Sequence, residues 1–310
     1  MRKLLILGSN GLVGKNANQY FGNSNEYKIY TINKGQLDLR NQNLVNELFS
    51  EIKPDIVLNA AAKVGGIQYN MKKPTELLLE NLIISTNVLN SSLINGVSKF
   101  INFGSSCMYP TDIEYPMAPK FLQSGRVEQS SEYYAMYKLV SWKIVDAISR
   151  EFDKNWLTVI PSTIYGPNDN FSLEKGHVLS SLIRKFHDAK LNSTENLILW
   201  GDGTPLREFI YIDDLLDALK ILIDYDTSER ILNIGPQSEI SIFKLASKIS
   251  SIIGYKGEII FDHKSSNGSH RKVLDSSYIR TLGWEPKISL TEGIAKTYVW
   301  YKESKNVVRF

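Results

Sequence analysis

Short runs of apolar residues alternate along the chain with longer segments in which apolar residues recur at helical spacing. The first runs predict β-strands at Lys3–Leu7, Tyr27–Ile32, Asp55–Asn59, Lys99–Phe103 and Trp156–Ile160. The longer segments between them predict helices, including Thr75–Leu93 and Glu132–Ile148. Because strands and helices follow one another at intervals of about 20 to 45 residues, we expect βαβ units. The pattern therefore predicts an α/β fold built on a doubly wound parallel sheet.

The pattern loosens after Pro161. Residues Ile164–Lys175 are rich in Gly, Pro, Asn and Asp, which indicates a loop that leaves the first domain. Farther on, the pattern predicts a strand at Ile231–Gly235, a polar loop at Ser265–His270, and helices at Asp213–Ile223, Ser241–Ile253 and Leu290–Tyr301. We therefore expect a first domain over residues 1–160, to which residues 208–238 return, and a smaller α/β domain over most of residues 161–310.

The composition is that of an ordinary globular protein, with 43% hydrophobic and 22% charged residues. No continuous apolar run reaches the roughly 18 residues of a membrane helix, and the apolar part of the N-terminal segment is too short for a signal peptide. The net charge is +3 without a basic block, which argues against nucleic-acid binding. The single cysteine excludes an internal disulfide and a Cys-rich zinc site. We therefore expect a cytoplasmic protein with no membrane, nucleic-acid or metal partner.

A glycine-rich turn follows the first predicted strand. Gly8, Gly11 and Gly14 are spaced GxxGxxG between that strand and a helix. Glycines at this place permit a tight turn and the close approach of a pyrophosphate, whose charge is stabilised at the helix N-terminus. A turn with no ligand would have the same spacing, but the position after the first strand favours a dinucleotide-binding Rossmann domain. The expected contacts come from Gly8, Asn10, Gly11, Leu12, Val13 and Gly14.

The end of the second predicted strand bears on the choice of nicotinamide cofactor. An NAD-preferring site usually has Asp or Glu there for the ribose 2′-hydroxyl, whereas this chain has no carboxylate before Asp38. Lys34 could neutralise a 2′-phosphate, although a solvated loop lysine explains it equally well. We expect Asp38 to contact the adenine amine rather than the ribose. NADP(H) is therefore favoured, and NAD(H) is the alternative.

Three polar residues form a candidate catalytic set. Tyr134 and Lys138 lie one helical turn apart on a shared face, where the ammonium would lower the pKa of the phenol and make it a usable proton donor and acceptor. Ser105 follows the fourth predicted strand, where a hydroxyl can hydrogen-bond a substrate carbonyl. Each feature is weak alone. Together with the glycine turn, in this order and spacing, they are far more specific.

With this combination the chain resembles the extended short-chain dehydrogenase/reductase family, which modifies nucleotide sugars. Longer segments are similar to the GDP-L-fucose synthase family within it, the GDP-4-keto-6-deoxy-mannose 3,5-epimerase/4-reductases. These segments are Asn59–Ile67, Gly104–Pro110, Tyr165–Phe171, Gly176–Val178, Trp200–Gly203, Arg207–Phe209 and Arg271–Asp275. The resemblance runs essentially from end to end and implies that residues 161–310 mostly bind the nucleotide sugar.

The resemblance also implies roles for single residues. Ser105, Tyr134 and Lys138 would form the reductase triad, and Cys107 with His177 would be the epimerase acid/base pair. A 4-ketone acidifies the protons on C3 and C5, and a thiol and an imidazole have ordinary pKa values near neutrality. Without the resemblance, a lone cysteine is more often a small buried hydrophobe. Further implied cofactor contacts are Leu39, Ala61, Ala62, Lys138, Pro161, Ile164 and His177, and implied substrate contacts are Lys185, Trp200, Arg207 and Lys272.

Several positions depart from the family's pattern. Asn10 and Lys34 stand where arginines are usual, and Lys185 replaces an arginine whose bidentate phosphate contact an ammonium cannot make. The segment Pro161–Pro167 lacks an amide, and Tyr137 adds a phenol beside the triad. These changes suggest a 4-keto sugar of different bulk, such as a GDP-6-deoxy-4-keto-heptose.

Other functions stay open at this point. The enzyme could be a C4 reductase whose substrate is epimerised by a separate enzyme, or an NAD-dependent nucleotide-sugar C4-epimerase. A 4,6-dehydratase usually carries an acidic pair where this chain has Cys107 and Met108, and a dinucleotide-sensing regulator would be expected to lose Tyr134 or Lys138. The resemblance further implies a homodimer formed through the helices Thr75–Leu93 and Glu132–Ile148, and a part in surface polysaccharide biosynthesis.

Overall fold

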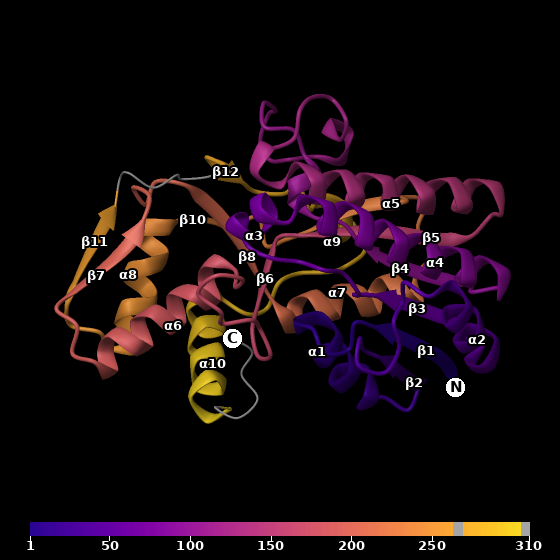
Figure 1. The fold of residues 1–310 in the computed structure, drawn as a ribbon, viewed down its shortest axis with the longest axis horizontal. Coiled ribbons are helices and arrows are strands. Elements are labelled where there is room, and N and C mark those ends of the chain that lie inside the picture. The colour runs from indigo at the N-terminus through magenta and orange to yellow at the C-terminus, as the bar shows by residue number, and fades with distance from the viewer. Residues whose placement is uncertain (263–268, 305–310) are drawn as a thin grey trace.

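The computed structural model describes residues 1–262 and 269–304, and its largest element is a six-stranded parallel sheet in the order β2-β1-β3-β4-β5-β9 (Figure 1). The strands are β1 (Arg2–Leu7), β2 (Tyr27–Ile32), β3 (Ile56–Asn59), β4 (Lys99–Phe103), β5 (Asn155–Pro161) and β9 (Ile231–Ile234). From β1 the chain moves first to β2 on one side and then to β3 on the other. The crevice in which such sheets bind ligands therefore lies at the carboxyl ends of β1 and β3. The predicted doubly wound sheet is confirmed.

Helices cover both faces of this sheet. One face carries α1 (Leu12–Gly22) and α7 (Ile212–Asp224), and the other carries α2 (Gln42–Ile52), α4 (Asn81–Ile94) and α5 (Glu132–Glu151). Alternate side chains of β1 belong to the two cores, Leu4 and Ile6 to the first, Leu5 and Leu7 to the second. Because both faces are buried, β1 has a continuous apolar sequence rather than an alternating one.

The predicted helix Thr75–Leu93 consists of two segments, the π-helical turn η1 (Glu76–Glu80) and α4. By length and composition alone, Glu76–Ile94 is apolar enough to cross a membrane, a test that core helices also pass. Its buried polar side chains bind other parts of the chain. The Ser85 hydroxyl lies 2.7 Å from that of Ser141 on α5, and Asn87 donates a hydrogen bond to the Leu39 carbonyl at 3.0 Å. These contacts pack the segment against the sheet and its neighbouring helix.

A smaller group of elements follows β5 and lies on the left in Figure 1. At its centre is β8 (Leu206–Tyr211), which pairs with β6 (Thr163–Tyr165) and β12 (Arg271–Lys272) in parallel and with β10 (Glu239–Ser241) antiparallel. A separate parallel pair joins β7 (Asn196–Trp200) and β11 (Glu258–Asp262). The helices here are α6 (Val178–Leu191), α8 (Ile242–Ile253) and α10 (Leu290–Glu303), and short helical turns elsewhere are α3 (Ile67–Lys72), η2 (Ser106–Met108), η3 (Pro119–Phe121), η4 (Gln129–Ser131) and α9 (Ser277–Thr281).

The predicted loop Ile164–Lys175 is wrong at its first residues. Ile164 and Tyr165 belong to β6, because β8 supplies hydrogen-bonding partners that no local pattern reveals. Within residues 208–238, β9 lies in the six-stranded sheet and α7 on its face, while β8 belongs to the smaller group. The division of the chain into domains at residue 160 stays a prediction. The predicted polar loop Ser265–His270 lies largely outside the described residues.

Candidate active site

The glycine turn brings the start of α1 close to the end of β1. A β-carbon at Gly14 would lie 2.4 Å from the Gly8 carbonyl oxygen, so only glycine allows this approach. Gly11 occupies the N-cap position, and no side chain caps the helix. The amides of its first turn can therefore bind an anion. Asn10 is exposed and Leu12 and Val13 are half-buried beside this turn, which fits the pyrophosphate of a dinucleotide.

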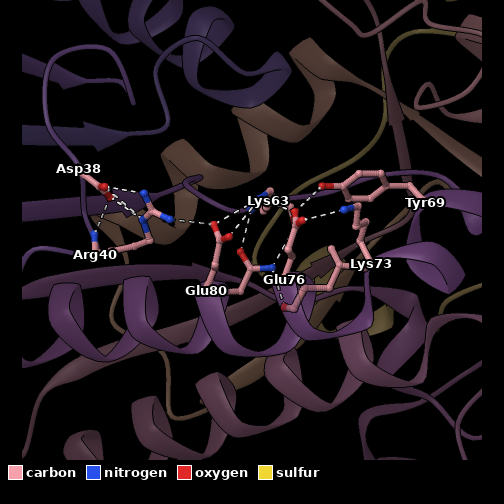
Figure 2. A network of polar contacts seen from close by, with 9 residues as sticks. Asp38, Arg40, Lys63, Tyr69, Lys73, Glu76 and Glu80 are labelled. Carbon is pink, nitrogen blue, oxygen red and sulfur yellow. Dashed lines mark hydrogen bonds and ion pairs between the residues drawn. The ribbon is translucent and has the colours of Figure 1, made fainter.

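Three charged side chains, Lys34, Asp38 and Arg40, follow the end of β2. Lys34 is exposed, as expected of a residue that meets a phosphate, while Leu39 is buried in the core. Arg40 binds both oxygens of Asp38, at 3.0 Å from Nε to Oδ1 and 2.7 Å from Nη2 to Oδ2 (Figure 2). These hydrogen bonds hold the pKa of Asp38 at about 2. The Asp38 carboxylate therefore stays ionised and already has one strong partner.

A network of ion pairs continues from Arg40 to the loop that follows β3 (Figure 2). Arg40 Nη1 lies 3.3 Å from Glu80, and Lys63 Nζ lies 3.2 Å from Glu80 and 2.6 Å from Glu76. The Asn81 side chain binds both the amide and the carbonyl of Lys63, at 2.7 and 2.9 Å. Partly exposed ion pairs add little stability each. Together they fix the backbone next to Ala61 and Ala62, the two predicted cofactor contacts in this loop.

The predicted triad comes from the carboxyl end of β4 and the first turns of α5. Ser105 is the N-cap of η2, and its hydroxyl accepts a hydrogen bond from the Cys107 amide at 3.3 Å. Lys138 Nζ lies 5.7 Å from the centre of the Tyr134 ring and 4.9 Å from that of Tyr137. It also donates a hydrogen bond to the carbonyl of Phe103, two residues before Ser105. The structure thus brings the three predicted residues to one edge of the sheet.

Burial governs the protonation of this group. It lowers the pKa of Lys138 to about 7 and raises the pKa of Tyr134 above its ordinary value, with a smaller contribution from Cys107. The expectation that the ammonium lowers the pKa of Tyr134 is therefore wrong for this structure. Removal from water disfavours the phenolate and so raises the pKa of the phenol. A lysine with a pKa near neutrality can instead give or take a proton itself.

Cys107 lies in a cluster of charged side chains. Lys272 Nζ is 3.7 Å from Cys107 Sγ and 3.2 Å from a carboxylate oxygen of Glu128. Burial alone would lower the pKa of Lys272, but Cys107 and Glu128 raise it above its ordinary value. Burial lowers the pKa of Arg207, the register partner of Lys272, and Glu128 and Cys107 offset part of this effect. Two predicted substrate residues, Arg207 and Lys272, therefore meet beside the predicted thiol.

The other predicted residues lie on α6, β5, β6 and β7. His177 is the exposed N-cap residue of α6, and its ring makes no hydrogen bond to Cys107 in the described part of the chain, so their partnership stays a prediction. Pro161 ends β5 and Ile164 lies in β6. Lys185 on α6 stands over the ring of Trp200 at the end of β7, with its Nζ 5.0 Å from the ring centre. Burial lowers the pKa of Lys185.

The sequence analysis missed Glu128 and Arg40. No local pattern marks Glu128, whose contact with Lys272 spans 144 residues of chain. Arg40 could have been found from its place two residues after Asp38, at a strand end where charge matters. Among residues 1–262 and 269–304, no group of three or more His, Cys, Asp or Glu side chains is placed to hold a metal ion.

Comparisons with known proteins agree with this geometry. The NAD dependent epimerase/dehydratase family matches residues 4–235. GDP-L-fucose synthase 1 of Arabidopsis thaliana is 38% identical over 299 residues, which is 96% of this chain and 93% of that protein. The crystal structure of a GDP-6-OMe-4-keto-L-xylo-heptose reductase from C. jejuni has a TM-score of 0.93 at 29% identity, covering 97% of this chain and 98% of that one. A GDP-L-fucose synthetase from Naegleria fowleri bound to NADP has a TM-score of 0.90 at 27% identity, covering 100% and 95%.

Proposed function

The chain belongs to the GDP-L-fucose synthase family, within the NAD dependent epimerase/dehydratase family, and we propose that it reduces a GDP-4-keto-6-deoxy sugar with NADPH and epimerises it at C3 and C5. The observation that supports this proposal is that the candidate reductase and epimerase residues lie at the same edge of the sheet. There Ser105, Tyr134 and the buried Lys138 adjoin Cys107, which itself contacts Lys272. A reductase triad and a group able to move protons thus face the same space.

NADP(H) is the cofactor that the site and the relatives support. The Gly8–Gly14 turn would hold its pyrophosphate, because the first turn of α1 presents uncapped amides. Lys34 would meet the 2′-phosphate, and no unpaired carboxylate stands at the end of β2 to favour a 2′-hydroxyl, since Asp38 is bound by Arg40. The similar Naegleria fowleri structure contains NADP. Bound NADPH supplies the hydride that reduces C4.

The triad handles the proton of this reduction. The Ser105 hydroxyl donates a hydrogen bond to the C4 carbonyl, which orients the ketone toward Tyr134. The Tyr134 phenol gives its proton to the C4 oxygen as that oxygen becomes an alkoxide. Lys138, with a pKa of about 7, then returns a proton to the Tyr134 phenolate. Each step uses a group that the structure places at the carboxyl end of β4 or on the first turns of α5.

Epimerisation needs a base and an acid on opposite faces of the sugar. Cys107 removes the proton beside the C4 ketone, and His177 returns one to the other face of the resulting enolate. Lys272 supports this step because its ammonium contacts Cys107 Sγ at 3.7 Å and neutralises charge on sulfur. Arg207 and Lys272 would also bind the diphosphate, while Lys185 and Trp200 would meet the guanine and its ribose.

A GDP-6-deoxy-4-keto-heptose is the second candidate substrate. The similar C. jejuni structure is that of a heptose reductase, and Thr163 and Lys185 depart from the pattern of hexose enzymes. In that case the enzyme reduces C4 while a separate epimerase acts before it. An NAD-dependent C4-epimerase fits the end of β2 less well, since Asp38 is occupied by Arg40.

The test follows the purified protein with NADPH and GDP-4-keto-6-deoxy-mannose in deuterated water. We expect nicotinamide oxidation with deuterium at C3 and C5 of the product. Tyr134→Phe should slow oxidation by about 100-fold or more, whereas Tyr133→Phe, which removes a hydroxyl from the exposed neighbouring residue, should leave it unchanged. Cys107→Ser should abolish the deuterium at both carbons.

Three other results would change the proposal. Oxidation without deuterium would make this protein a C4 reductase that depends on a separate epimerase. Faster turnover of the heptose in a direct comparison would identify the second candidate as the substrate. Equal rates for Tyr134→Phe and wild type would contradict the reductase triad.

We also propose where the enzyme acts and how its copies associate. We place it in the cytoplasm, where the single cysteine stays reduced, in the supply of sugars for a surface polysaccharide. A homodimer is proposed because exposed apolar side chains gather on η1 and α5, namely Leu79, Tyr133, Met136 and Val140. They adjoin a hollow of about 200 Å³ lined by Pro74, Thr75, Leu78, Leu79 and Tyr133. A second copy of the chain would cover this face.

A further inference from the structure

A buried carboxylate lies next to the substrate-facing Arg207. Glu208 is the following residue of β8, so its side chain points to the opposite face of that strand. It is only 2% exposed. Burial of a carboxylate costs free energy unless polar partners replace water. The partners of Glu208 therefore indicate what it does.

Glu208 binds two backbone amides from distant parts of the chain. Its Oε2 accepts a hydrogen bond from the Leu274 amide at 2.9 Å, and its Oε1 accepts one from the Gln237 amide at 2.6 Å. The backbone also closes around the carboxylate at Gly235, where a β-carbon would lie 2.5 Å from Oε1. The carboxylate thus ties β8 to the segments on both of its sides.

One of these segments, residues 271–275, is called here the 271–275 strap. It pairs with β8 only at Arg271 and Lys272, where β12 ends. Beyond that point Val273 accepts a hydrogen bond from the Met117 amide at 2.8 Å, and Asn233 donates one to the Asp275 carbonyl at 3.0 Å. On this side Leu274 forms a bridge with Met117, whose carbonyl accepts a hydrogen bond from the Asp275 amide at 2.9 Å. On the other side, where pairing with β8 has ended, Glu208 supplies the contact that holds Leu274 to β8.

The position of the strap matters because it carries Lys272. The Lys272 ammonium lies 3.7 Å from Cys107 Sγ and 3.2 Å from Glu128, so a small shift of the backbone would separate it from the thiol. We propose that Glu208 is a positioning residue, whose two amide contacts hold the 271–275 strap so that Lys272 stays beside Cys107. Cys107 moves protons only under the proposed function, and the catalytic meaning of this role rests on that function.

Ionisation of Glu208 in the folded protein costs free energy because the carboxylate is buried. Burial raises its pKa to about 7, and the amides of Leu274 and Gln237 lower it in part. A glutamine would have the same shape without the charge. Its amide group, however, would present N–H to one of the two backbone N–H groups. The ionised carboxylate, which predominates above about pH 7, accepts from both.

The test measures how fast iodoacetamide alkylates Cys107, the single cysteine of the chain. A neighbouring ammonium speeds this reaction because it favours the thiolate. Lys272→Met should therefore slow alkylation on the order of tenfold, and Glu208→Gln should slow it to a similar degree. The double variant should be no slower than Lys272→Met, because both changes remove the same contact. Glu292→Gln makes the same chemical change at an exposed residue of α10. It is the matched control, and its Cys107 should be alkylated at the wild-type rate.

The same variants are then compared in the deuterium assay. Glu208→Gln should lower the amount of deuterium incorporated per NADPH oxidised. General destabilisation of the fold would lower both activities together and leave this ratio unchanged. If Glu208→Gln fails to unfold cooperatively on heating, Glu208→Asp replaces it, since it keeps the charge but cannot reach both amides. Two results would overturn the positioning role. One is a folded Glu208 variant in which Cys107 is alkylated at the wild-type rate. The other is a double variant that is alkylated more slowly than Lys272→Met, with the two single effects multiplied. If wild type neither oxidises NADPH nor exchanges protons, the proposed function fails while the alkylation rates still decide the placement of Lys272.

Discussion

Lys138 and Glu208 are two buried ionisable side chains whose pKa values both lie at about 7. The cause is the same for both, since burial disfavours the charged form and so lowers the pKa of a base and raises that of an acid. Their uses differ. Lys138 adjoins the reacting groups, where a proton that moves near neutral pH is an advantage. Among the described residues, the hydrogen bonds that Glu208 accepts come from the backbone amides of Gln237 and Leu274, and its contribution is geometric.

Glu208 makes a specific contribution to the pH dependence of stability. Its pKa is 4.5 in the unfolded chain and about 7 in the folded protein. Between these values the folded state binds more protons, so stability falls as the pH rises. From pH 5 to pH 8, wild type should lose about 2 kcal/mol of unfolding free energy that Glu208→Gln does not lose. Urea unfolding at the two pH values measures this difference, with Glu292→Gln as the control. Parallel changes in wild type and Glu208→Gln would contradict it.

The position of helix α1 depends on Gly14, which has no side chain. At Gly14 the helix backbone approaches the Gly8 carbonyl so closely that a β-carbon would stand 2.4 Å from the oxygen. The helix N-terminus, with its uncapped amides, is thereby held at the crevice between β1 and β3. Element geometry and cofactor binding therefore depend on the same glycine.

Gly14→Ala should move the start of α1 and weaken the site. Overpacking of this kind costs about 1–3 kcal/mol of stability, and NADPH affinity should fall on the order of tenfold as the amides are displaced. Urea unfolding and fluorescence titration with NADPH measure the two effects. Gly22→Ala is the matched control, because a β-carbon at the last residue of α1 meets nothing within 4 Å. It should bind NADPH normally, and normal binding by Gly14→Ala would contradict the prediction.

Most strands of the main sheet could be predicted because they are buried on both faces and are therefore mainly apolar, as β1, β3 and β5 are. The edge strand β2 is only half-buried, but it too is mostly apolar. The short strand β12 could not be predicted, because two residues carry no pattern and depend on pairing with β8. The same division holds in the site. Ser105, Tyr134 and Lys138 belong to local motifs, whereas the contact between Lys272 and Cys107 joins residues 165 positions apart. Burial also raises the pKa of Tyr134, which the sequence motif led us to expect to be lowered. A local motif does not show how deeply its residues are buried in the fold.

At the scale of the whole molecule, α5 has two tasks. One side carries Tyr134 and Lys138, and the other presents exposed apolar side chains. Tyr133, Met136 and Val140 are spaced at three and four residues along it and, with Leu79, are between 39% and 54% exposed. A second copy packed on this face would stiffen the helix that carries Tyr134 and Lys138.

Val140→Glu should therefore convert a dimer into a monomer, because it places a charge within the apolar face. Analytical ultracentrifugation over a range of concentrations gives the state of association. Val299→Glu makes the same change at an exposed apolar position on α10 and should leave the dimer intact. A wild type that sediments as a monomer, or a dimer that survives Val140→Glu, would contradict the proposed interface.

The residues of the proposed active site come from different parts of the chain. Ser105, Tyr134 and Lys138 stand on the main sheet and α5, whereas His177, Arg207 and Lys272 belong to α6, β8 and β12. After gene duplication, loss of His177 alone would remove the proposed proton return to the sugar while leaving Ser105, Tyr134 and Lys138 in place. Lineages of this architecture can therefore specialise by loss, and a new sugar product requires no new catalytic group.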